Sequence, residues 1–297
     1  MEKYLNYYYN IKVDKTNIQS INQNYKICGN NYNYMLICYE GDIKYLEDIL
    51  YFNSQLIQLG VPCNQIVLTN NNELFMLLDK KRYVLLKYKK EYDREITLND
   101  ILKFNYFYIE KTRFDCSNWK KLWEAKMNYF EYQMNQFGYK HPLLRESFGY
   151  YSGYVELALE LLNDIEIDNL RLSHRRIKKN YILYNLYDPF NLIIDSRVRD
   201  FAELFKDEMF DEDILNKLSK LILNLNLNNK ECKLLFIRLL YPTFYFDRYE
   251  KIMEKNLDDE VIKPILKKTN QYELTIKKVY NYLKQIVDMP LIEWLEN

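Results

Sequence analysis

The stretch from Arg171 to Glu203, RLSHRRIKKNYILYNLYDPFNLIIDSRVRDFAE, decides how this chain folds. Its landmarks, in order, are a histidine-led turn (172–174), an apolar strand-like pair (182–183), a second apolar run (192–194) that ends on Asp195, and an Arg199-Asp200 pair that opens a helix. Polar side chains at the ends of short apolar runs give this stretch the layout of an active site.

The composition sets outer bounds on the class of protein. The chain has 297 residues and a mass of 36.5 kDa, which is enough to bury one large core or two modest ones. Lys+Arg and Asp+Glu are both 42, and this balance gives no electrostatic case for a nucleic-acid partner or an anionic membrane. No apolar run approaches the ~20 residues of a membrane helix, and the N-terminal MEKYLNYYYNIKVDK lacks the apolar core of a signal peptide. We therefore expect a cytoplasmic protein.

The metal-binding residue types are few and scattered. The five cysteines, at positions 28, 38, 63, 116 and 232, contain no C-x-x-C pair, which argues against a disulfide framework and against zinc. His141 and His174 are the only histidines, so a histidine-rich metal site is excluded.

Residues 1–90 have the pattern of a small α+β unit. YKICG and YNYMLICYE are aromatic and aliphatic runs of strand length around a turn at Gly29-Asn30-Asn31. A helix capped by Asp42 follows, and two further strands are predicted at 74–78 and 83–88.

Residues 91–297 have an almost wholly helical pattern. Thr97 and Asp100 form a capping-box-like start, and Ser117 is the predicted cap of a long helix that Gly138 ends. Further helices are predicted around 151–162 and at 201–205, 214–225, 232–240, 244–253 and 276–287. A small mixed part followed by a larger helical part predicts an α+β fold with two lobes.

Five segments of the second part resemble one known family. They are WKKLWEAKMNYFEYQ (119–133), HPLLRESFGYYSGYVELAL (141–159), SHRRI (173–177), DPFNLIIDSRVRDFAE (188–203) and RLLYPTFYFD (238–247). In content and order they are similar to the spore-coat (CotS/YutH-like) branch of the aminoglycoside- and choline-phosphotransferase-like kinases. The resemblance implies a bilobal protein-kinase-like fold and, in a spore-forming organism, a role in coat assembly.

The resemblance also implies that the catalytic positions are degenerate. Phosphoryl transfer needs a carboxylate to position the attacking hydroxyl and Mg²⁺ to neutralise phosphate charge. Aligning Ile182 and Leu183 with the family's Ile-Leu puts the catalytic aspartate at Arg176 and the metal-binding asparagine at Tyr181, with Asn180 one residue early. A guanidinium cannot accept a proton, so Arg176 cannot act as the base.

The nucleotide-binding positions are degenerate as well. The strand residue that should be a phosphate-gripping lysine is Ile37, and the six glycines form no Gly-x-Gly-x-x-Gly loop. The resemblance places a vestigial nucleotide cleft near Ile37, Leu86, Asn180 and Asp195. We expect no cofactor, and ATP with Mg²⁺ belongs only to the alternative, enzymatic interpretation.

Three residues of the quoted stretch have structural interpretations that we favour. Asp195 is the one retained residue of a metal-ligand type, but without a partner ligand we expect a structural carboxylate rather than a Mg²⁺ site. Asp200 is expected to cap the helix that it opens and to brace the turn at His174. His174 is expected to be a hydrogen-bonded scaffold residue.

A run of cations precedes these residues: Arg171, Arg175, Arg176, Lys178 and Lys179. We predict that one of them, with Arg176 as the first choice, pairs with Asp195 and takes the place of Mg²⁺. The other interpretation, a solvated basic loop, stays open. Anion binding by the same cluster is a further option.

Three functions are compatible with these residues. The leading one is a non-catalytic kinase-like protein with protein partners such as other spore coat proteins, located in the cytoplasm or, in a sporulating organism, in the coat. The second is a divergent ATP-dependent small-molecule kinase with Asp188 as its base and with Asp195 and Asn180 as metal ligands. The third is a pseudokinase scaffold that still binds nucleotide.

Overall fold

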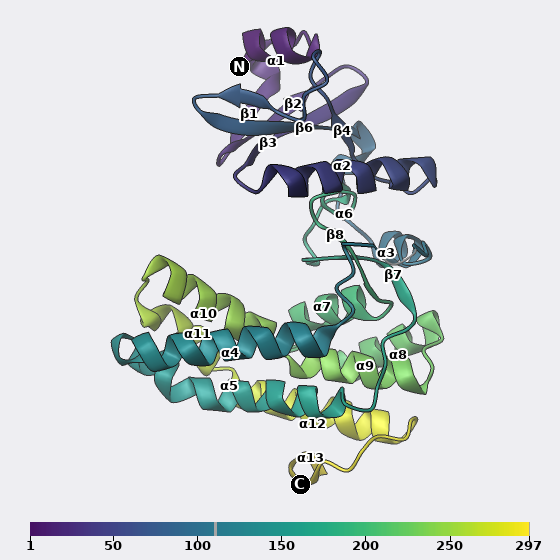
Figure 1. Cartoon of the computed structure of the whole chain (residues 1–297). Helices are drawn as coiled ribbons and strands as arrows, with labels where there is room; N and C mark the ends of the chain where they lie inside the picture. Colours follow the sequence, from purple (N-terminus) through teal and green to yellow (C-terminus); the bar gives the residue numbers. More distant parts are fainter. Residues whose placement is uncertain (110–111, 297) are drawn as a thin grey trace. The chain divides into compact units, whose positions relative to one another are not determined.

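The computed structural model describes residues 1–109 and 112–296, which form two compact units (Figure 1). Unit 1 comprises Met1–Phe107 with Lys179–Leu192, and unit 2 comprises Tyr108–Lys178 with Ile193–Asn297.

The division between the units differs from the expected boundary after residue 90. Backbone hydrogen bonds tie part of the quoted stretch to the residues that follow the sheet: the N–H of Leu183 donates to the carbonyl of Arg94 (2.8 Å), and the N–H of Ile96 donates to the carbonyl of Tyr181 (3.0 Å). The segments 91–107 and 179–192 therefore belong with the first unit.

Unit 1 is an antiparallel sheet with helices packed against it. Its elements are α1 (Glu2–Tyr9), β1 (Ile18–Ile21), β2 (Asn24–Cys28), β3 (Tyr32–Tyr39), α2 (Ile43–Gln58), β4 (Gln65–Val67), β5 (Met76–Leu78), β6 (Lys81–Lys89), α3 (Leu98–Phe104) and α6 (Leu183–Leu186). The strand order is β1-β2-β3-β6-β4, and β5 pairs with β6. The predicted strands and the helix capped by Asp42 are confirmed, and the Asp42 carboxylate accepts from the N–H of Tyr45 (3.1 Å).

The helix α1 and the strand β1 were not predicted. Leu5 and Tyr9 of α1 lie in one apolar cluster with Ile27, Leu36 and Leu85 of the sheet. The helix has only eight residues, and its YYY run blurs the helical period, so packing against the sheet rather than pattern explains its formation.

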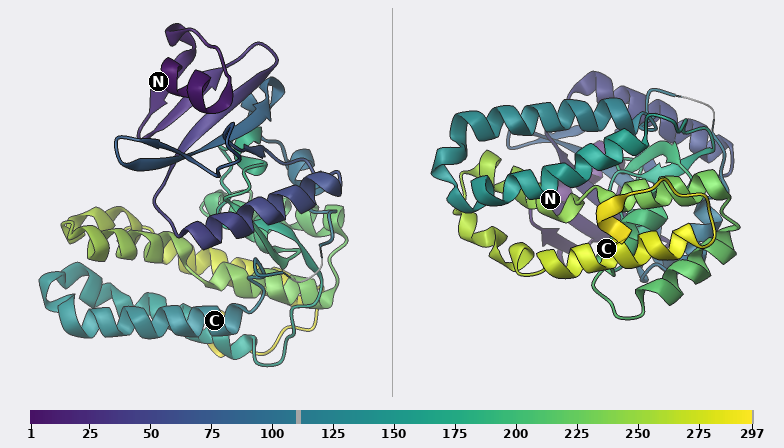
Figure 2. Two further views of the ribbon diagram at one scale, coloured as in Figure 1. Left: turned by 45° about the horizontal axis from the view of Figure 1, so that its top comes forward. Right: turned by 90° about the horizontal axis from the view of Figure 1, so that it is seen from below.

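Unit 2 is mainly helical and contains one short pair of strands. Its elements are α4 (Trp119–Phe137), α5 (Pro142–Leu161), β7 (Leu170–His174), β8 (Leu192–Ser196), α7 (Arg199–Asp207), α8 (Ile214–Leu225), α9 (Asn229–Leu240), α10 (Thr243–Lys255), α11 (Lys263–Leu266), α12 (Thr269–Lys284) and α13 (Glu293–Glu296). The long helices α4 and α5 lie side by side (Figure 1, Figure 2). In the part of the chain that the structure describes, no helix has the length and apolar character needed to cross a membrane.

Tyrosine fills much of the core of unit 2. The rings of Tyr151 and Tyr245 stack at 3.9 Å between centroids. The hydroxyl of Tyr249 donates to the carbonyl of Phe130 (2.9 Å), and the hydroxyl of Tyr272 donates to the carbonyl of Leu240 (3.0 Å). A buried tyrosine hydroxyl usually finds such an acceptor, and Tyr249 and Tyr272 therefore act as apolar core residues whose polar tip is satisfied.

Several local predictions are confirmed and others are wrong. Thr97 and Asp100 form the predicted capping box of α3. The cap of α4 is Asn118 rather than Ser117, because asparagine caps a helix as well as serine does. The predicted turn at 172–174 belongs to the strand β7, and the strand-like pair at 182–183 is wrong, since Leu183 opens the short helix α6.

Candidate functional site

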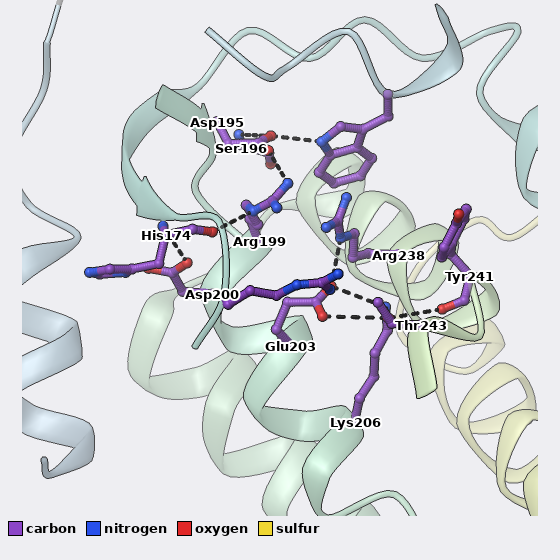
Figure 3. A network of polar contacts seen from close by, with 12 residues as sticks. His174, Asp195, Ser196, Arg199, Asp200, Glu203, Lys206, Arg238, Tyr241 and Thr243 are labelled. Carbon is purple, nitrogen blue, oxygen red and sulfur yellow. Dashed lines mark hydrogen bonds and ion pairs between the residues drawn. The ribbon is translucent and has the colours of Figure 1, made fainter. Parts of the chain in front are cut away.

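Asp195, on the strand β8, lies at the centre of the candidate site and is fully buried, with 0% of its surface exposed. Its Oδ1 accepts hydrogen bonds from the indole Nε1 of Trp119 (2.7 Å) and from the backbone N–H of Ser196 (2.6 Å). Its Oδ2 lies 2.5 Å from Nη1 of Arg199. Figure 3 shows the carboxylate between these donors. Because every contact is a donor, the side chain is held as a carboxylate whose charge is balanced inside the protein.

Arg199 reaches Asp195 because it opens the helix α7 four residues further along the chain. Its Nε donates to the carbonyl of His174 (2.8 Å), and its Nη2 donates to the carbonyl of Arg175 (3.2 Å). The guanidinium is therefore fixed by oxygens on two sides. Burial raises the pKa of the Asp195 carboxyl above its ordinary value, while the positive charges of Arg199 and Arg238 act in the opposite direction.

The prediction that Arg176 pairs with Asp195 is wrong. Nη2 of Arg176 lies 2.7 Å from Oδ1 of Asp247 on α10, in a pair whose side chains are 47% and 37% exposed. A cation does pair with Asp195, but it is Arg199, because the i,i+4 geometry at the start of α7 brings its side chain back to the end of β8. The spacing Asp195-x-x-x-Arg199 at a predicted helix start was the signal in the sequence.

His174 and Asp200 form a second buried contact beside the first. The Asp200 carboxylate accepts from the backbone N–H of His174 (2.9 Å) and lies 2.6 Å from Nδ1 of the same residue. This is the brace that the sequence led us to expect. The expected capping role is wrong, since α7 has no side-chain cap hydrogen bond and Asp200 lies inside its first turn.

Arg238 extends the site into a charged cluster that the sequence did not reveal. Its guanidinium lies 5.0 Å from the ring centroid of Trp119 and 5.5 Å from that of Trp123. Its Nε donates to Oε1 of Glu203 (2.9 Å), and Nζ of Lys206 donates to the same oxygen (3.1 Å). Trp119 therefore contacts both Asp195 and Arg238 and joins the two groups of charges.

The charged cluster also contacts α10. Burial and the neighbouring charges shift the pKa values of its members. Nζ of Lys206 also donates to the hydroxyl of Thr243 (2.7 Å), as Figure 3 shows. Burial lowers the pKa of Lys206 to about 8, although the charge of Glu203 raises it. Burial alone would raise the pKa of Glu203, but Lys206 and Arg238 bring it well below its ordinary value. A signal existed in the sequence, because Arg238 and Thr243 lie in the RLLYPTFYFD segment.

The residues that we expected to line a nucleotide cleft are divided between the two units. Ile37, Leu86 and Asn180 belong to unit 1, and Asp195 belongs to unit 2. Ile37 pairs with Val84 across β3 and β6, and side chains alternate along a strand, so Ile37 and Leu86 share one face of the sheet. Leu86 is fully buried and Asn180 is exposed.

Other residues of unit 1 contact the sheet face that carries Ile37 and Leu86. Asp93, just beyond β6, lies 2.8 Å from Nζ of Lys26 and accepts from Nδ2 of Asn33 (2.7 Å) and from the hydroxyl of Tyr88 (3.3 Å). The ring of Tyr88 lies 4.6 Å from that of Tyr184, in the segment 179–192. The chain's own side chains therefore cover the part of this face around Tyr88.

Side chains of the types that bind metal ions do not form a cluster in the rest of the described structure. Across residues 1–109 and 112–296, no group of three or more His, Cys, Asp or Glu side chains is arranged to hold a metal ion.

The fold that carries this site is that of the aminoglycoside-phosphotransferase-like kinases. An aminoglycoside phosphotransferase from Alicyclobacillus acidocaldarius matches with a TM-score of 0.63 at 12% identity, over 91% of this chain and 92% of that chain. A spectinomycin phosphotransferase in complex with ADP and spectinomycin matches with a TM-score of 0.54 at 13% identity, over 97% and 94%. The expected α+β, kinase-like fold is confirmed.

Within that class, the chain belongs to a spore-coat family. Residues 2–279 match the family described as "Spore coat putative kinase YutH". A relative from Bacillus subtilis (strain 168), named "Endospore coat-associated protein YutH", is 24% identical over 287 residues, which are 84% of this chain and 85% of the relative. The resemblance seen in the five sequence segments is thereby confirmed.

Proposed function

We propose that this chain is a non-catalytic kinase-like protein that acts in spore coat assembly as a binding scaffold. The observation that carries the proposal is the buried ion pair between Asp195 and Arg199, at the position where the resemblance expects a metal ligand. Membership of the spore-coat family supports the coat as its location and coat proteins as its partners.

The residues present do not fit Mg²⁺. A divalent cation binds carboxylate lone pairs directly, and both oxygens of Asp195 already accept from donors. Binding a metal there would require the Arg199 guanidinium to leave a buried carboxylate or would place two cations against each other. Because the guanidinium is also held by two backbone carbonyls, that rearrangement would break several hydrogen bonds at once.

The residues at the base position do not fit proton transfer either. Arg176 cannot accept a proton, and the nearby carboxylate of Asp247 is neutralised by Arg176 itself. Asp188, the alternative base, accepts from the backbone N–H of Phe190 (3.0 Å) in a local turn. These contacts favour structural roles for the carboxylates that the enzymatic alternative would need.

The sheet face of unit 1 also argues against a nucleotide. A base would have to displace the contacts between Tyr88 and Tyr184 and those around Asp93, and β1 and β2 are joined by a tight turn at Asn22-Gln23 rather than by a glycine-rich loop. We therefore propose that the chain needs neither ATP nor Mg²⁺.

A thermal-shift measurement of the purified chain with ATP, with and without Mg²⁺, tests the proposal, because a ligand of the folded state raises its stability. The proposal predicts no shift in either condition. A shift only with Mg²⁺ would support the divergent kinase, and a shift independent of Mg²⁺ would support the nucleotide-binding scaffold. Either result would overturn the proposal.

A further inference from the structure

The helix α4 carries two apolar stripes, and one of them faces solvent. The buried stripe is made of Trp119, Trp123, Met127 and Phe130. The exposed stripe, called the α4 stripe below, is made of Leu122 (49% exposed), Ala125, Tyr129 (55%) and Tyr132 (61%). Contiguous exposed apolar side chains on a helix are typical of an interaction surface.

The spacing of the α4 stripe is that of a helix-packing seam. Its members are separated by three, four and three residues, which is the a/d spacing of a heptad repeat. Nε2 of Gln133 donates to the hydroxyl of Tyr129 (2.9 Å) and restrains that ring on the surface of the helix. The stripe therefore offers a row of side chains into which a second helix can pack.

The stripe is complementary to itself. If two copies run antiparallel about a two-fold axis between positions 125 and 129, the small Ala125 faces the partner's Tyr129, and Leu122 faces the partner's Tyr132. Large side chains then meet small ones in the central layers, as close packing requires.

The charges beside the stripe permit this pairing. Lys126 on one flank is neutralised by Glu250 of α10 (3.0 Å). Asn128 and Gln133 flank the centre and are neutral amides, and the exposed Lys121 residues of the two copies lie at opposite ends of the pair. Like charges therefore do not meet at the centre of the pair. The flanking residues also give no preference for a strongly charged partner protein over a second copy of this chain.

We propose that the α4 stripe is a self-association surface through which two copies of this chain form a two-fold symmetric, antiparallel helix pair. Such an interface is isologous and closes at the dimer. The stripe from Leu122 to Tyr132 spans only about 15 Å of the helix, so the contact is small, and the proposed dimer is a weak one with a dissociation constant in the micromolar range. The proposal does not depend on the state of the kinase-like site.

Sedimentation velocity of the full chain from about 1 to 100 µM tests the proposal, since a micromolar dimer forms across that range. We expect the wild type to shift from monomer to dimer. The variant Ala125→Lys should raise the dissociation constant at least about tenfold, because it places a charge against the partner's ring.

The matched control is Gln58→Lys, which adds the same charge to an exposed position of another helix, α2. It should dimerise like the wild type, and unchanged melting temperatures would show that both variants are folded. A wild type that stays monomeric at about 100 µM, or two variants that dimerise equally, would overturn the proposal.

Discussion

Arg199 and Asp195 form a buried ion pair with 2.5 Å between Nη1 and Oδ2, at the position where the family resemblance leads us to expect a metal ligand. The arginine comes from the helix that follows the strand, so the same local segment supplies both charges. The Asp195 carboxylate thus holds the start of α7 against the end of β8.

Replacing Arg199 by methionine should destabilise the chain by about 3–5 kcal/mol, because it leaves a buried carboxylate without its cation. The free energy of unfolding from urea denaturation measures the cost. The control is the double variant Arg199→Met with Asp195→Asn, which removes both charges and should recover part of the loss. A cost below about 1 kcal/mol for Arg199→Met would contradict a buried pair.

Replacing Arg176 by alanine should cost no more than about 1 kcal/mol, because solvent screens its exposed pair with Asp247. The same urea experiment applies, and added salt should weaken the effect further. A loss as large as that of Arg199→Met would mean that Arg176 has a buried structural role that its exposure does not reveal.

Replacing Trp119 by phenylalanine should cost about 1–3 kcal/mol, because Asp195 loses the indole donor and Arg238 loses part of its aromatic partner. Thermal denaturation of this variant is compared with that of Trp294→Phe, whose indole is 41% exposed. Equal melting temperatures for the two variants would show that the indole hydrogen bond has no role in stability.

The stability should depend on the protonation of Lys206. Its pKa is lowered from 10.5 to about 8 by burial, so between these pH values the unfolded chain holds a proton that the folded chain has released. Unfolding then takes up a proton, and the free energy of unfolding should rise with pH in this window.

The variant Lys206→Met isolates that contribution. The difference in free energy of unfolding, wild type minus variant, should increase from pH 8 toward pH 10.5, the span of the shifted pKa. A difference that stays flat or falls over this range would mean that the amine keeps its ordinary pKa in the folded chain.

The sequence predicted the elements whose pattern is local. The strands around Gly29, the capping box at Thr97 and the helix at 214–225 each follow from spacing and cap residues, and the structure has all of them. The five family segments predicted the fold and the family, because their order along the chain is itself a constraint.

The sequence could not predict the contacts that depend on packing. Asp195 had several cations within reach in sequence, and although the i,i+4 spacing at a helix start points to Arg199, it takes the geometry of α7 to select Arg199 over Arg176. Arg238 meets Glu203 and Trp119 across gaps of 35 and 119 residues, which no local pattern records. The segment 179–192 was read as part of a second lobe, because its hydrogen bonds to Arg94 and Ile96 are also long-range.

Isothermal titration of ATP with Mg²⁺ into the wild type and into Asp195→Asn tests the central claim most directly. If Arg199 occupies the carboxylate in place of a metal, neither protein should bind the nucleotide–metal complex. Binding by the wild type that needs Mg²⁺ and disappears in Asp195→Asn would show that Asp195 is a metal ligand and would contradict the account.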